Sequence, residues 1–168
     1  MSQRFFRSLA VVALSGVGAL SLYVRAEPIV RLAPAAFSKL PSTVRTGLVR
    51  NGCSVPQSFL AKGPENAIAG SFTRIGAREW AVLCSVNGVS SILIFSVRSE
   101  EPLSRIAESP DDTYVQVIGE GLTGFSRRIS AVSAPTPGLT AIDDAFLEKA
   151  STVWVRSGRV WLETAGAD

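Results

Sequence analysis

One stretch decides the fold, Glu79-Trp-Ala-Val-Leu-Cys-Ser-Val-Asn-Gly-Val-Ser-Ser-Ile-Leu-Ile-Phe-Ser-Val97. Asn87-Gly88 is the dipeptide that type I′ hairpin turns prefer, so Glu79 to Val86 and Val89 to Val97 are predicted to be paired strands. A two-residue loop fixes the register, with Cys84 opposite Ser91. Both faces of this hairpin are apolar, which predicts central strands that are covered on both sides.

Further elements follow outward from the hairpin. Ala67 to Phe72 is predicted to be a neighbouring strand. Towards the N-terminus, the apolar period of residues 41 to 51 predicts a short helix that ends at Gly52. Residues 99 to 112 are charged and contain two prolines, so we expect an exposed segment. Towards the C-terminus, Thr113 to Ile118 and Phe125 to Val132 are predicted to be strands, and Thr140 to Lys149 one or two helical turns, because Thr140 and Asp143 have capping-box spacing.

The C-terminal segment predicts a second hairpin with its turn at Ser157-Gly158. This register places Trp154 directly opposite Trp161 and Arg156 opposite Arg159. Two adjacent indoles flanked by guanidinium groups could form a flat stacking surface for a sugar ring, a peptide or a partner protein. The alternative is that this face is covered and that the tryptophans belong to the core. Trp154, Trp161, Arg156 and Arg159 are the candidate binding face.

The N-terminus has the composition of a secretory signal peptide. Arg4 and Arg7 precede an apolar run from Ser8 to Val24, and small or aliphatic residues stand three and one before a cut after Ala26. We therefore expect a signal peptide over 1–26, a linker or strap over 27–40 and one globular domain over 41–168. The expected location is the periplasm or the exterior. An uncleaved N-terminal anchor in the inner membrane is the alternative, because the run has about the minimum length of a membrane span.

Charge and cysteine content narrow the possible partners. Cleavage after residue 26 would leave 14 of the 17 basic residues against 14 acidic ones. A neutral chain lacks the basic excess that nucleic-acid binding needs, so no nucleic acid is expected. Two cysteines, Cys53 and Cys84, remain in an exported chain, and an even number favours a disulfide. The fold class predicted is therefore α+β, with a mainly antiparallel sheet built from hairpins and an N-terminal helix linked to it by a disulfide. An all-β sandwich is the alternative.

Catalytic motifs are absent from the sequence. There is no histidine, which removes the usual triads and histidine-ligated zinc, and two cysteines are too few for a thiolate zinc site. Gly119 to Gly124 spells G-x-G-x-x-G, but it precedes a predicted strand rather than a helix. A carboxylate-dependent hydrolase could use acids from one small set: Asp111, Asp112, Asp143, Asp144 and Glu148. We expect no enzyme, no cofactor and no metal.

The stretch Ala67-Ile-Ala-Gly-Ser-Phe-Thr-Arg-Ile-Gly-Ala-Arg-Glu-Trp-Ala-Val-Leu83 resembles a single FG-GAP or VCBS-type repeat of integrin-like β-propellers. Gly70 and Phe72 match the positions ahead of that family's calcium loop, but residues 73–78 carry no carboxylate, and calcium needs six to eight oxygen ligands. The segment Cys53 to Pro56 together with Trp80 to Cys84 also resembles short uncharacterised exported proteins of bacteria, which implies no activity. The sequence thus favours an exported, non-catalytic module that binds an envelope component, a carbohydrate or a partner protein. A structural or inhibitory accessory protein of the periplasm and a small hydrolase are the alternatives.

Overall fold

The computed structural model describes residues 29–166, so the predicted signal peptide over 1–26 lies outside the described residues. Every paired strand in this range is antiparallel to its neighbour. The elements in chain order are β1 (Arg31–Leu32), a 3-10 turn (Pro34–Ala36), α1 (Ser42–Arg50), β2 (Val55–Pro56), β3 (Ala67–Gly70), β4 (Glu79–Val86), β5 (Val89–Ser96), β6 (Pro102–Pro110), a 3-10 turn (Asp111–Tyr114), β7 (Val115–Gly119), β8 (Leu122–Phe125), β9 (Arg127–Ser133), β10 (Thr140–Phe146), β11 (Ala150–Ser157) and β12 (Val160–Ala165).

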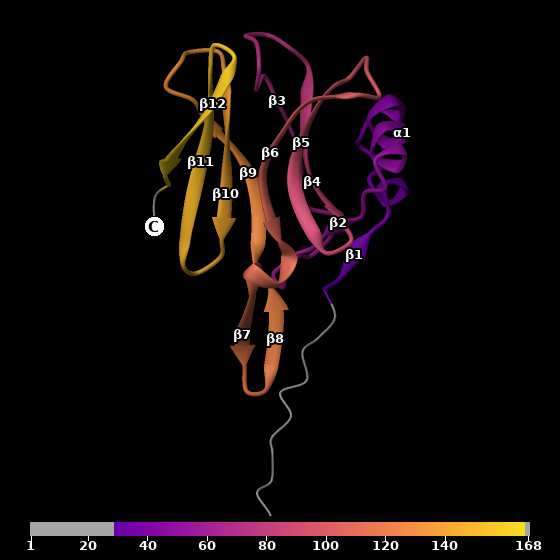
Figure 1. The fold of residues 1–168 in the computed structure, drawn as a ribbon, viewed down its shortest axis with the longest axis vertical. Coiled ribbons are helices and arrows are strands. Elements are labelled where there is room, and N and C mark those ends of the chain that lie inside the picture. The colour runs from indigo at the N-terminus through magenta and orange to yellow at the C-terminus, as the bar shows by residue number, and fades with distance from the viewer. Residues whose placement is uncertain (1–28, 167–168) are drawn as a thin grey trace, which may run out of the picture.

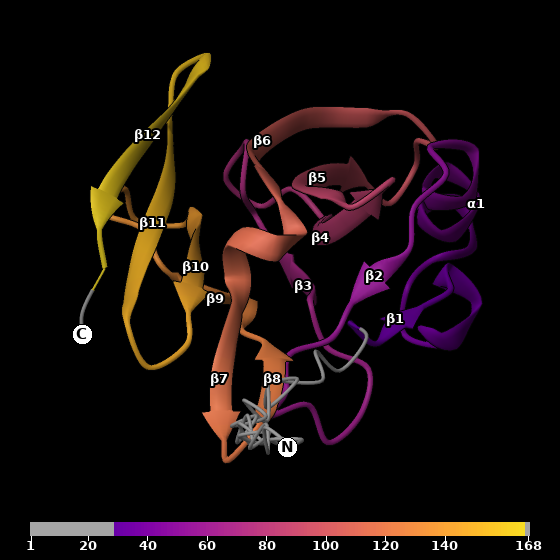
Figure 2. The same cartoon turned by 60° about the horizontal axis from the view of Figure 1, so that its bottom comes forward.

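Two four-stranded sheets and one helix form three layers. The central sheet has the order β3-β4-β5-β6, and the second sheet has the order β12-β11-β10-β9. Helix α1 covers one face of the central sheet, and the second sheet lies beside its other face (Figures 1 and 2). Both sheets are meanders, in which each strand pairs with the strand that precedes it in the chain.

The central hairpin is confirmed in turn and register. Asn87 and Gly88 have φ values of 52° and 80°, as a type I′ turn requires, and Cys84 pairs with Ser91. Alternate side chains of β4 and β5 enter two separate cores, because successive residues of a strand point to opposite faces. The helix-side core contains Phe37, Leu40, Val44, Leu48, Cys53, Val55, Val82, Cys84, Leu93 and Phe95. The inter-sheet core contains Phe72, Ala81, Leu83, Ile92, Ile94, Phe125, Ile129 and Ile142.

Helix α1 matches the predicted helix to within one residue at each end. Val44 and Leu48 are fully buried, and Gly47 stands between them on the sheet-facing side. A Cβ at Gly47 would lie 2.8 Å from Phe95 Cε1 and closer still to the Glu100 carbonyl oxygen. The absence of a side chain at Gly47 therefore lets α1 approach the sheet closely.

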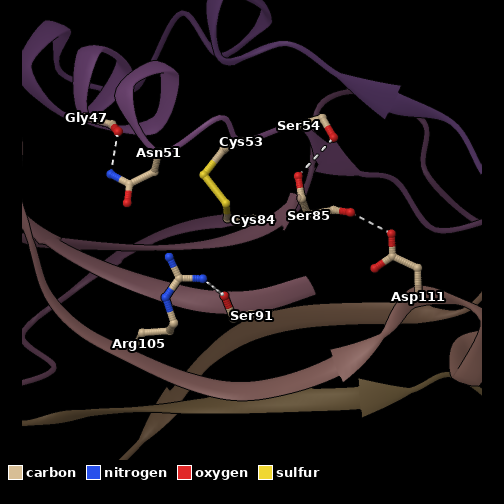
Figure 3. Close-up of a disulfide and its surroundings, with 9 residues drawn as sticks. All are labelled: Gly47, Asn51, Cys53, Ser54, Cys84, Ser85, Ser91, Arg105 and Asp111. Carbon is tan, nitrogen blue, oxygen red and sulfur yellow. Dashed lines mark hydrogen bonds between the residues drawn. A yellow bond between two sulfur atoms is a disulfide. The ribbon is translucent and has the colours of Figure 1, made fainter. Parts of the chain in front are cut away.

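The predicted disulfide is confirmed. Cys53 and Cys84 are bonded, with a Cα–Cα distance of 5.0 Å, and both are buried in the helix-side core (Figure 3). The bond joins the chain just beyond α1 to the central strand β4. The predicted antiparallel hairpins and disulfide-linked helix are thus confirmed. However, α1 follows β1 and is the one α-helix among residues 29–166, so the predicted α+β class is only partly supported.

The segment before α1 is part of the folded domain. Arg31 and Leu32 pair with β2, while Phe37 and Leu40 are 5% and 2% exposed in the helix-side core. Residues 29–40 therefore act as a strap on the domain rather than as a free linker, and the folded unit begins before residue 41.

One other sequence prediction is wrong, and another is incomplete. Thr140 to Phe146 is strand β10, because pairing with β9 and β11 on both sides outweighs the local capping pattern. Residues 102–110 form strand β6 at the edge of the central sheet. Their alternating exposure lets a charged segment pair with β5 while its polar side chains reach solvent.

Candidate functional site

The C-terminal hairpin has a different register from the predicted one. Its two-residue loop is Gly158-Arg159, so Ser157 pairs with Val160, Trp154 with Glu163 and Arg156 with Trp161. Gly158 has a φ of 59°, and glycine at the first loop position is typical of a type II′ turn. Trp154 and Trp161 therefore share a face as predicted, but they are diagonal neighbours rather than directly opposed.

That shared face is turned towards the protein interior. Trp154 and Trp161 are half-buried and pack against the inter-sheet core. Both indole Nε1 atoms are buried and have no hydrogen-bond partner within the described part of the chain. The structure thus brings the two tryptophans together, but it places their ring nitrogens where a ligand in solution does not meet them.

The two arginines of the candidate face differ in their environment. Arg156 Cζ lies 5.6 Å from the centroid of the Trp161 ring, and Arg156 Nε donates to the Gly158 carbonyl at 2.9 Å. Arg159 is exposed in the turn. Arg156 therefore lies against the Trp161 ring and holds the turn, so its guanidinium group already has contacts of its own.

The opposite face of this hairpin is apolar and open. Val153, Val155, Val160 and Leu162 alternate with the inward residues, and we call these four residues the outer patch. Val160 and Leu162 are 57% and 49% exposed, and Val155 pairs with Leu162 across the hairpin. Strand β12 pairs with β11 and has no second neighbour within residues 29–166. The hairpin therefore presents apolar side chains and a strand edge together.

The carboxylates considered for a hydrolase do not converge. Arg127 Nε and Nη2 donate to the two Asp144 oxygens at 2.9 and 2.7 Å, and this pair is buried. Asp111, in contrast, accepts from Arg31 Nη2 and from Ser85 Oγ, both at 2.6 Å. The Ser85–Asp111 contact lies close to the disulfide (Figure 3).

The remaining acids occupy other places. Asp143 accepts from Ser130 Oγ at 3.3 Å, whereas Asp112 and Glu148 are exposed. Asp111 was expected in an exposed loop, but it is 2% exposed in the 3-10 turn after β6. Among residues 29–166, no group of three or more metal-ligating acidic or cysteine side chains gathers.

Arg127 is a central residue that the sequence analysis missed. It is fully buried, and besides Asp144 it donates to Ser90 Oγ at 3.0 Å and to the Ala107 carbonyl at 2.6 Å. Its Cζ lies 4.6 Å from the Tyr114 ring centroid. Burial raises the pKa of the Tyr114 hydroxyl, and the positive charge of Arg127 opposes this increase in part. Arg127 links the second sheet to β5 and β6.

Glu79 is another buried acid, and its carboxylate stabilises a loop. It accepts from the backbone N–H groups of Phe72 and Thr73 at 2.7 and 2.8 Å and from Thr73 Oγ1. Its carboxylate therefore holds the loop between β3 and β4. Arg74 and Arg78 of that loop are exposed.

An apolar groove of about 580 Å³ lies at one end of the molecule. The strap, the loop after β2 and the β7–β8 hairpin line it. Its apolar side chains include Ile29, Val30, Leu32, Phe59, Ile118 and Phe125. Ser58, which also lines the groove, has a buried Oγ without a hydrogen-bond partner in the described chain. In the sequence, the one indication of this groove is that two adjacent apolar residues, Val117 and Ile118, stand next to the turn of a short hairpin.

No protein-family model, curated protein or solved structure matches this chain. In addition, no helix among residues 29–166 has both the length and the apolar character needed to cross a bilayer. The disulfide is consistent with an oxidising compartment. The function is therefore inferred from the geometry of the β11–β12 hairpin and of the groove.

Proposed function

We propose that the protein is an exported, non-catalytic module that binds a partner polypeptide of the cell envelope along strand β12. The observation that carries this proposal is the open edge of β12 beside the outer patch. An exposed strand edge offers unpaired backbone groups to an incoming extended chain, and alternate side-chain contacts provide selectivity.

The hydrogen-bond pattern of the hairpin supports this mode of binding. Gly166 N donates to the Ser151 carbonyl at 2.8 Å, which marks these two residues as a hydrogen-bonded pair. Pairs alternate along an antiparallel ladder, so Trp161 and Glu163 direct their backbone N–H and C=O groups away from β11. Ala165 occupies the same kind of position, so three residues of β12 have both backbone groups available for a further strand.

Natural edge strands usually carry features that prevent such pairing, for example lysine, proline or a bulge. Strand β12 reads Val160-Trp-Leu-Glu-Thr-Ala165, contains neither lysine nor proline, and has Glu163 as its single charged residue. Its register with β11 is regular from Thr152 to Ser157. An edge with one charge and with neither proline nor a bulge is suited to a specific partner strand.

The same geometry favours a polypeptide over a carbohydrate. A sugar platform needs exposed aromatic faces, whereas Trp154 and Trp161 pack against the inter-sheet core. The side chains that face outward are aliphatic, which suits the alternate residues of a partner strand. The hydrolase alternative receives no support from the acids, because Asp111 and Asp144 are in separate ion pairs.

Site-specific photocrosslinking in the expressing cell tests the proposal. A photoreactive residue is placed in turn at Val160, Leu162 and Thr164, which share the outward face, and at Val49 of α1, which is 64% exposed. We expect one protein to be crosslinked from the three β12 positions and not from Val49. Leu162→Lys should remove this adduct, because a charged side chain on the edge opposes strand addition, and the matched Val49→Lys should not. Equal crosslinking from Val49 and from β12 contradicts the proposal.

A further inference from the structure

Exposed apolar side chains concentrate at the end of the molecule that holds the groove. Among the described residues, five of the eleven exposed large hydrophobic residues belong to this end, and we call them the hairpin pole: Val30, Leu60, Val117, Ile118 and Leu122. Val117 is 71% exposed and Leu122 is 46% exposed, because both belong to a two-stranded hairpin that has little core of its own. Exposed apolar side chains that gather at one end of a domain indicate an interaction site.

The groove continues this surface into the domain. A Cβ at Gly124 would lie 2.7 Å from Phe59 Cβ and 2.9 Å from Ile118 Cδ1, so the glycine allows the loop after β2 to pack closely on the hairpin. Phe59 N also donates to the Phe125 carbonyl at 2.8 Å. The hairpin is therefore held against the domain and projects from it in a defined direction, as Figure 1 shows.

The N-terminal end of the described chain lies at this surface. Ile29, the first described residue, lines the groove beside Ile118. The apolar run from Ser8 to Val24 ends only five residues earlier in the sequence. Five extended residues span at most about 17 Å, so the end of the run cannot be farther than this from the groove. The hairpin pole is thus the end of the domain nearest to any membrane that holds this run.

We propose that, in the chain that keeps residues 1–26 as an uncleaved anchor, the hairpin pole is a membrane-contacting surface that rests in the interfacial layer of the lipid bilayer through Val117, Ile118 and Leu122. Apolar side chains on a rigid element bind this layer in proportion to the apolar area that they bury there. The charged residues nearest in sequence to the pole residues are Lys62, two residues after Leu60, and Glu120, between Ile118 and Leu122; they are of opposite sign, so contact does not depend on anionic lipid. The β11–β12 turn lies at the other end of the molecule (Figure 1), which leaves the edge of β12 away from the bilayer.

Depth-dependent fluorescence quenching tests this proposal on the full chain. Both native cysteines are in the disulfide, so Leu122→Cys or Val160→Cys introduces a single free thiol for a bimane label. Each labelled chain is reconstituted into vesicles of phosphatidylethanolamine and phosphatidylglycerol that carry a nitroxide on the acyl chain. We expect quenching at position 122 to exceed quenching at position 160 by at least about threefold, because Val160 is a comparably exposed apolar position at the opposite end.

A second comparison separates apolar contact from mere tethering. Leu60→Ser together with Ile118→Ser should reduce quenching of the label at position 122 by at least about half, whereas Leu162→Ser should leave it unchanged. The signal should also persist between about 0.05 M and about 0.5 M salt, because exposed charges are screened over this range and apolar contact is not.

Three results would overturn the proposal: equal quenching at positions 122 and 160, no effect of the serine substitutions, or loss of quenching at high salt. The first would leave the groove to a protein or peptide ligand. None of them bears on strand addition at β12, which the crosslinking experiment tests separately.

Discussion

Replacing Arg127 by Met is expected to destabilise the protein far more than any comparable change on its surface. The side chain is fully buried and makes two hydrogen bonds to Asp144, two to Ser90 and one to the Ala107 carbonyl. Its removal leaves the Asp144 carboxylate, which is 7% exposed, without its countercharge. Breaking a buried ion pair by removing one partner lowers the free energy of unfolding by about 3–5 kcal/mol.

A double-mutant cycle distinguishes this mechanism from simple loss of packing. Asp144→Leu alone leaves the Arg127 guanidinium buried and unpaired, so a similar loss of about 3–5 kcal/mol is expected. Arg127→Met with Asp144→Leu removes both charges, and the remaining penalty of about 1–3 kcal/mol comes from the Ser90 and Ala107 carbonyls that lose a donor. The double variant should therefore be more stable than either single variant, or at least no less stable.

Urea unfolding followed by tryptophan fluorescence and circular dichroism, with the disulfide intact, measures these differences. Arg128→Met is the matched control, because Arg128 is the exposed neighbour in β9 and its loss should change stability by less than about 0.5 kcal/mol. If Arg127→Met does not fold, Asp144→Asn gives a milder variant that keeps the side-chain shape. Additive single losses in the double variant, or a loss below about 1 kcal/mol for Asp144→Asn, would refute the reasoning.

Three further predictions concern buried groups. The double Cys53→Ala, Cys84→Ala variant should lose about 3.5 kcal/mol in urea unfolding, because the bond closes a loop of sequence separation 31; an unchanged midpoint would contradict this. Glu79→Gln should lose about 1–3 kcal/mol in the same assay, since the carboxylate accepts two backbone N–H groups, whereas the exposed Glu163→Gln should lose almost nothing. Because burial raises the pKa of Tyr114 above its usual 10.0, the unfolded chain ionises first and stability should fall as pH rises above 10. Absorbance at 295 nm should show this tyrosine titrating above 10 in the folded protein, and a midpoint at or below 10 would argue against burial as the cause.

The sequence predicted the central hairpin because its signals agree with one another. Asn87-Gly88 specifies the turn, the apolar alternation specifies two buried faces, and Cys84 lies on the face that meets Cys53. The helix Ser42–Arg50 was equally accessible, since Val44 and Leu48 have helical spacing. Local and long-range preferences coincide in these elements.

The C-terminal half was harder to predict because its local signals are ambiguous. In Ser157-Gly158-Arg159, the glycine can be either the first or the second residue of a two-residue loop. With glycine second, Trp154 pairs with Trp161, and with glycine first, as in the structure, Trp154 pairs with Glu163. Strand β10 has weak local strand character, and it forms because β9 and β11 supply partners on both sides.

The inward orientation of the tryptophans and the burial of Arg127 were beyond sequence reasoning for a different reason. Both depend on how the second sheet lies against the first, and no residue period encodes that arrangement.

The meander order of both sheets has a consequence for the way the chain acquires its structure. Each strand from β4 to β6, and again from β10 to β12, pairs with the strand made immediately before it, so a chain that emerges N-terminus first can add strands one at a time. Short sequence separation between partners also favours rapid folding, because little loop entropy is lost before a contact forms. Cys53 emerges 31 residues ahead of Cys84 and its thiol stays unpaired until β4 arrives. With no other cysteine in the chain, this delay cannot produce a wrong intramolecular bridge, and β12, the last strand of the described residues to be made, forms an open edge of the second sheet.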